Sequence, residues 1–375
     1  MTELPGANAP AFRAPLHIAV GRWPEYMGGG ARTPHDLAVT QRRYGLASGL
    51  LTVGERQEQQ WILTPATPTD SLLSRMIKIG RGSRRSLYKY DLLDIHFALY
   101  GAPVILGGLG QQLPTITHFH GPWYAESDKP GSFIGQCRKL LEYLTYRTSQ
   151  RFIVHTSAFR AVLMRSFGIP SDIIDIIPPG LADEWFNDTE HVDAANVMAG
   201  RGVYICAVRR LVPRTGIADL VEAMRLLPSS ISLAVIGSGP ERERIEAWSL
   251  SNGLQSRVHF LGSLPDVEMR AVLRGAALAV VPTRALEGFG LAVIEALAVG
   301  TPVVATRVGG LIEVMRNFPS CLAAPRNVAD LAATILRVLS APPSRAACRA
   351  AASEYRWGAV HELTLAAYSR VASGC

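Results

Sequence analysis

The chain has 375 residues and a formal net charge of +7, with 48% apolar and 18% charged residues. This composition supplies ample material for hydrophobic cores and excludes a disordered chain. No run of roughly 18 apolar residues predicts a membrane-spanning helix, and the mild positive charge shows no aromatic residues interleaved with a basic stripe, which argues against a nucleic-acid partner. The five cysteines are dispersed without CxxC spacing, which indicates reduced thiols and a cytoplasmic location.

Short apolar, β-branched runs alternate with helix-like segments throughout the chain. This alternation predicts α/β units with parallel sheets. In the first half we expect strands at 16–20, 60–63, 92–96, 115–119, 151–155 and 173–177. In the second half we expect them at 203–208, 232–236, 258–261, 278–281, 302–305 and 320–323.

A proline- and glycine-containing stretch at 178–180 and a polar stretch at 187–196 indicate a linker between two domains. Two doubly wound parallel sheets that face each other leave a cleft at the carboxyl ends of their strands. Ligands bind there in open α/β sheets, so the strand-to-helix loops are the place to search. Asp94 and His96 end one such strand, where they line the cleft or pack in the core.

The most informative segment, residues 278–310, predicts strand, loop, helix, strand and glycine loop. Its helix contains one charged residue, Glu295, and a lone carboxylate in apolar surroundings costs several kcal/mol unless it is hydrogen-bonded. Glu295 therefore forms an internal ion pair or cap, or it accepts hydrogen bonds from ligand hydroxyls. Gly288 and Gly290 let the backbone approach a ligand at the helix N-terminus, which favours anions.

The motif E-G-F-G-L-x-x-x-E-A from Glu287, followed by G-T-P-V-V-A-T-x-V-G-G from Gly300, resembles the donor-site motif of the group 1 retaining glycosyltransferases, which have the GT-B fold. Glu287 and Glu295 have the E-x7-E spacing of that family. Other segments resemble the same family, and the resemblance covers roughly residues 16–370. These segments are the strand–loop–helix at 201–225, the glycine turn at 231–240, the H-G loop HFHGPW at 118–123, the strand IIPPG at 176–180, and Trp357 and Tyr368 of the terminal helix.

The resemblance implies an α/β protein of two facing Rossmann-like domains with an interdomain cleft. Residues 1–185 would bind the acceptor, residues 186–355 the nucleotide sugar, and residues 356–375 would form a helix that packs back toward the N-terminal domain. The implied reaction is retaining transfer of a sugar from a nucleoside-diphosphate donor to a glycan, lipid-linked or small-molecule acceptor, in cell-surface polysaccharide or glycoconjugate synthesis. The nucleotide sugar is a substrate, and no cofactor is implied.

The resemblance also assigns roles to residues. Glu295 would bind the ribose hydroxyls and Glu287 those of the donor sugar, Arg210 would supply charge to the diphosphate, and His120 would lie near the reacting carbon. The catalytic set is therefore His120, Glu287 and Arg210. The donor site comprises Gly29, Gly30, Arg210, Arg214, Gly237, Gly239, Glu287, Gly288, Phe289, Gly290, Leu291 and Glu295. The triplet at 28–30 also fits a plain flexible turn.

We expect no metal, because the chain has no Asp-x-Asp or similar carboxylate pair suited to Mg²⁺, and because His118 and His120 lack a third ligand at a recognisable spacing. One position departs from the pattern of the family, which usually places lysine before Gly216. This chain has Thr215 there, with Arg214 beside it. Either Arg214 replaces the lysine as the second diphosphate cation, or it faces solvent and the cation is missing.

Two other classes of function remain open on the sequence. One is a different enzyme of the same architecture, such as a sugar-nucleotide epimerase or a phosphorylase. A pyridoxal-dependent phosphorylase is disfavoured, because no lysine follows Lys139. The other is a non-catalytic sugar-nucleotide-binding protein, which would not hydrolyse any nucleotide sugar.

Six cations between Arg75 and Lys89, with no acid among them, form the one strongly basic run. The run is interleaved with apolar residues, so it is either a solvated helix face or a patch that faces a membrane surface or phosphates. Each cation near anionic lipid adds about 1 kcal/mol. With a polyprenyl-linked acceptor, we expect peripheral association with the inner membrane face.

Overall fold

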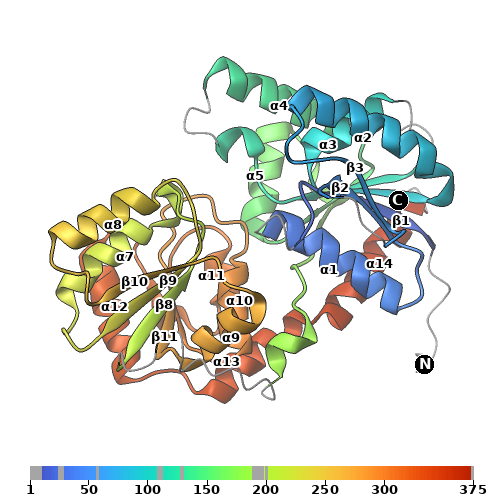
Figure 1. Cartoon of the computed structure of the whole chain (residues 1–375). Helices are drawn as coiled ribbons and strands as arrows, with labels where there is room; N and C mark the ends of the chain where they lie inside the picture. The colour runs from blue at the N-terminus through green and yellow to red at the C-terminus, as the bar shows by residue number, and fades with distance from the viewer. Residues whose placement is uncertain are drawn as a thin grey trace. The chain divides into compact units, whose positions relative to one another are not determined.

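The computed structural model describes residues 11–23, 29–55, 59–107, 113–126, 131–187, 198 and 202–372. The chain divides into two compact units. Unit 1 comprises residues 1–180 and 357–375, and unit 2 comprises residues 181–356. Each unit is built on one parallel sheet with helices on both faces (Figure 1).

Unit 1 contains a seven-stranded sheet with the order β3-β2-β1-β4-β5-β6-β7. Its strands are β1 (Pro15–Ile18), β2 (Gly49–Val53), β3 (Ile62–Ala66), β4 (Leu92–Ile95), β5 (Thr115–Phe119), β6 (Arg151–Val154) and β7 (Ile174–Ile176). Its helices are α1 (Gly29–Arg43), α2 (Leu72–Ser86), α3 (Ala98–Leu106), α4 (Phe133–Tyr146), α5 (Ser157–Phe167) and α14 (Trp357–Ala372).

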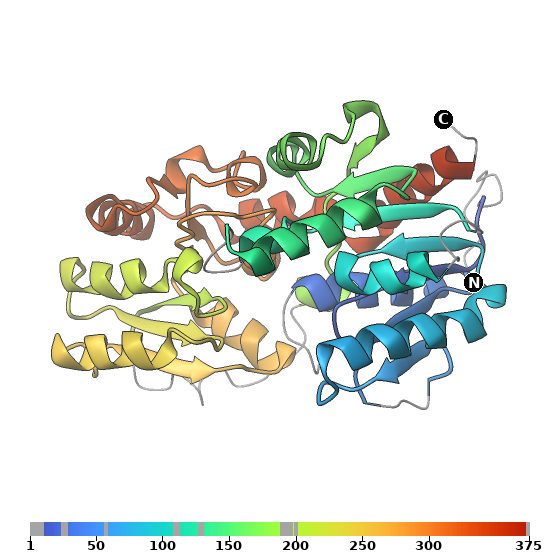
Figure 2. The same ribbon diagram turned by 90° about the horizontal axis from the view of Figure 1, so that it is seen from above.

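The central strands β1, β4, β5 and β6 are buried along their whole length, as parallel strands covered on both faces are. Helices α2, α3 and α4 pack side by side on one face, and α1 and α14 pack together on the other (Figure 1). Helix α14 comes from the far end of the chain and contacts β5 and β6 (Figure 2). All strands run the same way, so their carboxyl ends share one edge.

Local signals fix several helix ends in unit 1. The Thr156 side chain accepts a hydrogen bond from the Phe159 amide and begins α5. Gly168 ends α5 in the left-handed conformation, with φ of 69°, which glycine adopts without steric cost. Ser132 begins α4 in the same manner as Thr156 begins α5. Such caps are worth about 1 kcal/mol each.

Unit 2 contains a six-stranded sheet with the order β10-β9-β8-β11-β12-β13. Its strands are β8 (Tyr204–Val208), β9 (Ser232–Ile236), β10 (Val258–Gly262), β11 (Leu278–Val281), β12 (Val303–Thr306) and β13 (Leu322–Ala323). Its helices are α7 (Ile217–Ala223), α8 (Arg242–Ser251), α9 (Asp266–Gly275), α10 (Leu291–Ala298), α11 (Leu311–Val314), α12 (Val328–Ser340) and α13 (Arg345–Ala352).

One continuous hydrophobic core holds unit 2 together. Helices α7, α8 and α12 form one layer and α9, α10 and α13 form the other (Figure 1). Helix α10 is almost entirely buried, and Glu295 is its one charged residue. The strand order of unit 2 is that of a doubly wound nucleotide-binding sheet, so the predicted α/β architecture with two parallel sheets is confirmed.

The expected strands agree closely with the observed ones, with identical bounds for β5, β9 and β11. The exception is β2, which the sequence analysis missed because Ser48 and Gly49 interrupt the apolar run there. Within the described part of the chain, no helix is long and apolar enough to cross a membrane.

Candidate functional site

The loop after β8 lies at the carboxyl edge of the unit 2 sheet, against the glycine turn after β9. The Leu211 amide donates to the Ser238 carbonyl at 2.8 Å. Gly237 has a φ of 129°, and a Cβ added there would lie 2.0 Å from the Arg209 carbonyl oxygen. Only glycine permits this approach, so Gly237 packs one loop of the edge against the next.

The loop between β11 and α10 carries a carboxylate that is already paired. Glu287 forms an ion pair with Arg209 and accepts a hydrogen bond from the Thr283 hydroxyl at 3.0 Å. The same Arg209 nitrogen also lies 2.8 Å from that hydroxyl. The Glu287 and Arg209 side chains are only 13% and 10% exposed. The structure thus fixes the orientation of the carboxylate predicted to contact the donor sugar.

Arg214 forms hydrogen bonds to the same loop between β11 and α10. Its Nη1 donates to the Leu286 carbonyl at 3.0 Å, and its own carbonyl accepts from the Arg284 amide at 2.8 Å. Leu286 has a φ of 55°, in the left-handed region that a branched residue seldom adopts. Arg214 therefore holds a strained loop and does not point freely into solvent.

Thr215, the departure from the family pattern, is buried at 3% exposure. Its hydroxyl lies 2.8 Å from the carbonyls of both Arg210 and Val212. The Arg210 side chain is exposed and makes no hydrogen bond or ion pair with a described residue. Thr215 thus stabilises the loop through buried hydrogen bonds, and Arg210 is the exposed cation of the loop.

Helix α10 begins beside this loop, with Gly290 in the N-cap position at a φ of 99°. An N-terminus presents backbone N–H groups and a partial positive charge. Phe289 is buried and packs edge-on against Tyr355, with ring centroids 5.3 Å apart. Glu295 lies one turn inside the helix and is 5% exposed. The two glutamates therefore lie on either side of the start of α10 in the sequence, one before the helix and one inside it.

The predicted donor residues of unit 2 come from the loops after β8, β9 and β11 at one edge of the sheet and from the first turns of α10. The loops after β8 and β11 touch through Arg209 and Glu287 and through Arg214 and Leu286. In unit 1, Gly29 and Gly30 form the first residues of α1 and not a separate loop. Gly28 lies outside the described residues.

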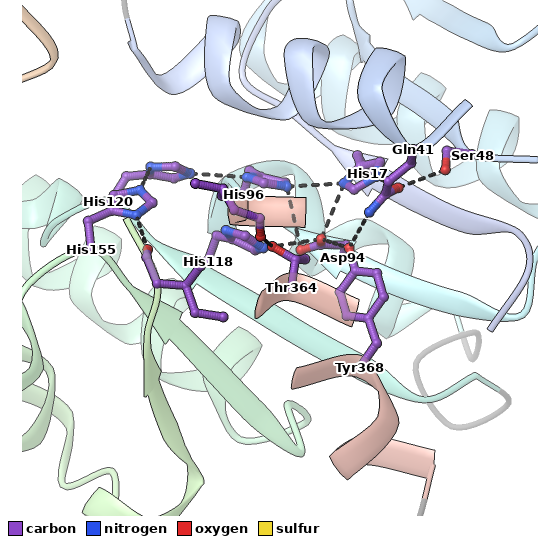
Figure 3. Close-up of polar contacts among 12 residues, drawn as sticks. His17, Gln41, Ser48, Asp94, His96, His118, His120, His155, Thr364 and Tyr368 are labelled. Atoms are coloured by element: carbon purple, nitrogen blue, oxygen red, sulfur yellow. Dashed lines mark hydrogen bonds and ion pairs between the residues drawn. The ribbon is translucent and has the colours of Figure 1, made fainter. Parts of the chain in front are cut away.

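Four histidines of unit 1 form a continuous row at the carboxyl ends of β1, β4, β5 and β6. We call His17, His96, His120 and His155 the imidazole row (Figure 3). Successive ring nitrogens lie 3.2, 3.1 and 3.1 Å apart, and the row ends on the Ile177 carbonyl, 2.9 Å from His155. Both ring nitrogens of His120 are thus occupied by neighbouring rings, although the sequence analysis expected its side chain to face the sugar.

Asp94 lies beside this row and is fully buried (Figure 3). Its Oδ2 is 3.2 Å from a nitrogen of His17 and 3.2 Å from one of His118, and it accepts a hydrogen bond from the Tyr368 hydroxyl. Burial opposes the charged form, but the rings of His118, His96 and His17 around the carboxylate outweigh it. The pKa of Asp94 is held well below its usual range.

Burial is the main influence on the pKa values of three histidines in the imidazole row. It lowers the pKa of His96 to about 3 and that of His155 to about 4. The pKa of His120 falls well below the ordinary value for the same reason, reinforced by the neighbouring histidines. Burial therefore favours the neutral form of all three rings near neutral pH.

The structure supplies a third nitrogen near the pair His118 and His120, namely that of His96. The three rings are nevertheless stacked, with interplanar angles of 22 to 25°. Nδ1 of His96 and Nε2 of His120 are engaged with each other at 3.1 Å, so neither offers a free lone pair to an ion. The rings fit a hydrogen-bonded row better than a metal centre.

Several residues of these clusters were not predicted from the sequence. They are His17, Gln41, His155 and Tyr368 in unit 1, and Arg209 and Thr283 in unit 2. A signal existed for most of the histidines, because three of the expected strands, 92–96, 115–119 and 151–155, carry a histidine at or next to their carboxyl ends. Arg209 adjoins the predicted Arg210, but its inward direction could not be deduced from the chain alone.

The chain and its fold are similar to known proteins. The family model described as "Glycosyl transferases group 1" matches residues 188–355, and that of "Glycosyltransferase Family 4" matches residues 27–185. The glycogen synthase of Mycobacterium tuberculosis is 31% identical over 76% of this chain and 70% of its own length. The 2-deoxystreptamine glucosyltransferase of Streptomyces kanamyceticus is 33% identical over 58% of this chain, and the match spans 59% of that enzyme.

Solved structures share the architecture. The sucrose-phosphate synthase of Thermosynechococcus elongatus aligns with a TM-score of 0.80 at 23% identity, covering 97% of this chain and all of that one. HepE of Anabaena, solved in complex with UDP and glucose, aligns with a TM-score of 0.80 at 18% identity over 95% of this chain and 99% of its own. The fold is therefore GT-B. The chain belongs to the group 1 glycosyltransferases, which confirms the resemblance seen in its motifs.

Proposed function

We propose that this protein is a retaining, metal-independent glycosyltransferase that moves a sugar from a nucleoside-diphosphate donor to a glycan or polyprenyl-linked acceptor. The observation that carries the proposal is the segment from Glu287 to Glu295. It places one oriented carboxylate before the N-terminus of α10 and one buried carboxylate inside that helix. This arrangement suits a diphosphate at the helix start and hydroxyl groups on either side.

Each group at this edge has a chemical task in the proposed reaction. The departing diphosphate gains negative charge, and preorganised donors where that charge develops are usually the largest catalytic contribution. The start of α10 and the exposed guanidinium of Arg210 supply such donors. Glu287 accepts hydrogen bonds from hydroxyl groups of the donor sugar in an orientation that Arg209 and Thr283 maintain.

The pairing of Glu287 also bears on stereochemistry. A retaining hydrolase uses two carboxyl groups about 5 Å apart, one of which attacks as a nucleophile. Glu287 is ion-paired with Arg209 and hydrogen-bonded by Thr283, and both contacts reduce the nucleophilicity of a carboxylate. This supports a same-face transfer in which no protein carboxylate forms a glycosyl intermediate.

The experiment that tests the proposal combines binding with turnover. UDP is the first probe in a thermal-shift panel of nucleoside diphosphates, because the similar HepE was solved with it. Binding at 100 times Kd stabilises the folded protein by about 2.7 kcal/mol. We then expect slow hydrolysis of the matching nucleotide sugar, at a rate that EDTA leaves unchanged.

Each alternative has its own outcome in this experiment. Binding without any hydrolysis would support a non-catalytic binding protein, and conversion of the donor sugar without loss of the nucleotide would support an epimerase. Loss of turnover in EDTA that Mg²⁺ or Mn²⁺ restores would contradict metal independence.

A lipid-linked acceptor is supported by one surface of unit 1. Helix α2 and the turn after it expose Leu72, Leu73, Ile77 and Tyr88 at 46 to 81%. Of the six cations in the basic run, Arg75 and Lys78 are bonded to the segment at Asp70, and Arg84 donates to the Gly107 carbonyl. The remaining cations Arg81, Arg85 and Lys89 are exposed and define, with the four apolar residues, what we call the α2 patch.

We expect the full-length protein to float with anionic liposomes through the α2 patch, and flotation to fall as salt rises, since charge attraction is screened beyond about 10 Å at 0.1 M. Replacing Arg81, Arg85 and Lys89 by glutamine should abolish most of the binding. The matched control replaces three exposed arginines elsewhere, Arg165, Arg225 and Arg326. Equal loss in both triple variants, or none in the first, would remove the α2 patch from consideration.

A further inference from the structure

The imidazole row is bounded by hydrogen-bond acceptors at both ends. At one end the Ile177 carbonyl can only accept, so His155 must donate through Nδ1. At the other end His17 Nε2 lies 2.8 Å from Gln41 Oε1. Between the ends, three nitrogen–nitrogen contacts of 3.1 to 3.2 Å join the four rings. The row therefore contains four rings and five hydrogen-bonding contacts.

The direction of the Gln41 amide follows from its surroundings. The single hydroxyl proton of Tyr368 goes to the Asp94 carboxylate, so Tyr368 can only accept from Gln41 Nε2, which lies 3.2 Å away. The amide oxygen is left facing His17, and it also accepts from Ser48 at 2.7 Å. Turning the amide over would place its oxygen against a hydroxyl oxygen that has no proton to give. His17 must therefore donate to Gln41.

The hydrogen bonds of the imidazole row need one proton more than four neutral rings carry. Each of the five contacts needs one proton, whereas four neutral imidazoles carry four N–H protons. With four protons, one contact would bring two lone pairs face to face at about 3 Å in a buried site, where an unmade hydrogen bond costs about 1–3 kcal/mol. With five protons every contact is satisfied, and one ring is an imidazolium.

The Asp94 carboxylate can balance the positive charge of the fifth proton. Asp94 is fully buried, and a buried carboxylate needs an opposite charge close by. His17 Nδ1 is 3.2 Å from its Oδ2. His118 Nε2 also lies 3.2 Å from Asp94 Oδ2, but neither ring nitrogen of His118 has a partner of good hydrogen-bond geometry among the described residues. His118 is therefore the neutral ring, since a charged one would bury N–H groups without well-placed acceptors.

We infer that the imidazole row holds one proton in excess of four neutral rings, with the Asp94 carboxylate as its counter-charge, and that this proton can be relayed along the row to His120. At rest it lies on His17, the ring of the row that contacts Asp94 Oδ2. Burial lowers the pKa values of the other three rings, which agrees with this placement. The titratable groups that face the row from neighbouring elements are Asp94, His118 and Tyr368.

The relay needs no movement of heavy atoms. His17 passes its Nδ1 proton to His96 Nε2, and His96 passes its Nδ1 proton to His120 Nε2. His17 gives one proton, His96 receives one and gives one, and His120 receives one, so the bonds and charges balance, His17 becomes neutral and His120 becomes the imidazolium. Resting on the proposed function, this places a mobile positive charge at the carboxyl edge of the unit 1 sheet, where a ligand of unit 1 would bind. Asp94, His17 and Gln41 act as positioning residues for that charge.

The test uses the full-length protein with ¹⁵N-labelled histidine at a pH of about 8, well above the ordinary histidine pKa of about 6.5. We expect nitrogen chemical shifts of one doubly protonated ring in the ligand-free protein. Gln41→Leu removes the acceptor at one end, leaves four contacts for four protons, and should abolish that signal. Gln41→Glu restores an acceptor and should keep it. His259→Gln, in unit 2, should leave the signal unchanged.

Activity provides the second readout. We expect Gln41→Leu to lower kcat about tenfold with little change in donor KM, and Gln41→Glu to recover most of it. The nitrogen shifts are measured without substrate, so they remain informative even if no donor is ever turned over. Absence of a doubly protonated ring at this pH, or its persistence in Gln41→Leu, would overturn the inference.

Discussion

Replacing Glu295 by alanine is expected to weaken the binding of nucleoside diphosphate by about 2–4 kcal/mol, because the ribose hydroxyls that we propose it binds would lose a charged, buried acceptor. Glu295 is 5% exposed on the apolar helix α10, so little solvent can replace it. Isothermal titration calorimetry with the preferred nucleoside diphosphate measures the effect. Glu295→Gln keeps the size and one acceptor oxygen and should lose less.

Glu243→Ala provides the matched control, because Glu243 is an exposed residue of unit 2 on helix α8. Its Kd should equal that of the unaltered protein. The melting temperature without ligand separates a binding effect from a folding effect. An unchanged Kd in folded Glu295→Ala would exclude Glu295 from the nucleotide site.

Replacing Arg214 by alanine is expected to lower kcat about a hundredfold, equivalent to about 2.7 kcal/mol of transition-state stabilisation. Two effects contribute. Under the proposed function the loop loses a cation for the diphosphate, and the Leu286 carbonyl loses the guanidinium that holds its strained backbone. Arg214→Lys should recover only part of the activity, because an ammonium group cannot reproduce the planar donor geometry. Steady-state kinetics with the matching nucleotide sugar measure both variants.

Thr215→Lys distinguishes the two roles considered for this loop. If a cation were simply missing, lysine at this position would raise activity. Thr215 is instead buried and hydrogen-bonded to the carbonyls of Arg210 and Val212, so we expect lysine to disrupt the loop and lower activity. A silent Arg214→Ala together with a more active Thr215→Lys would contradict this and leave Arg210 as the phosphate cation of the loop.

The fold could be predicted largely from local patterns. Buried parallel strands show as short β-branched runs, and ten of the twelve expected strands overlap an observed strand by three residues or more. The expected strands at 60–63 and 320–323 overlap β3 and β13 by two residues each. Strand β2 was missed because it begins with glycine and contains a threonine, which weakens the apolar signal. The edge that carries the site follows from the general rule for parallel sheets.

The side-chain pairings within the site could not be predicted in the same way. The spacing of Glu287 and Glu295 is a local feature and pointed to the correct segment. The partner of Glu287 is Arg209, 78 residues earlier, and such pairs depend on which strands become neighbours and where side chains point. His120 illustrates the same limit, because its ring is occupied by His96 and His155 from two adjacent strands.

The place of helix α14 in unit 1 has a consequence for biosynthesis. Tyr368, the hydroxyl donor to Asp94, follows it by 274 residues, and all of unit 2 is translated between them. Domains generally fold in order as they leave the ribosome. Here unit 2 would fold before the sheet of unit 1 is complete. Until then β5 and β6 are not covered by α14, and Asp94 lacks the hydrogen bond from Tyr368. Docking of α14 is then the last event in the folding of unit 1, so the half of the protein that is synthesised first is the half that is completed last.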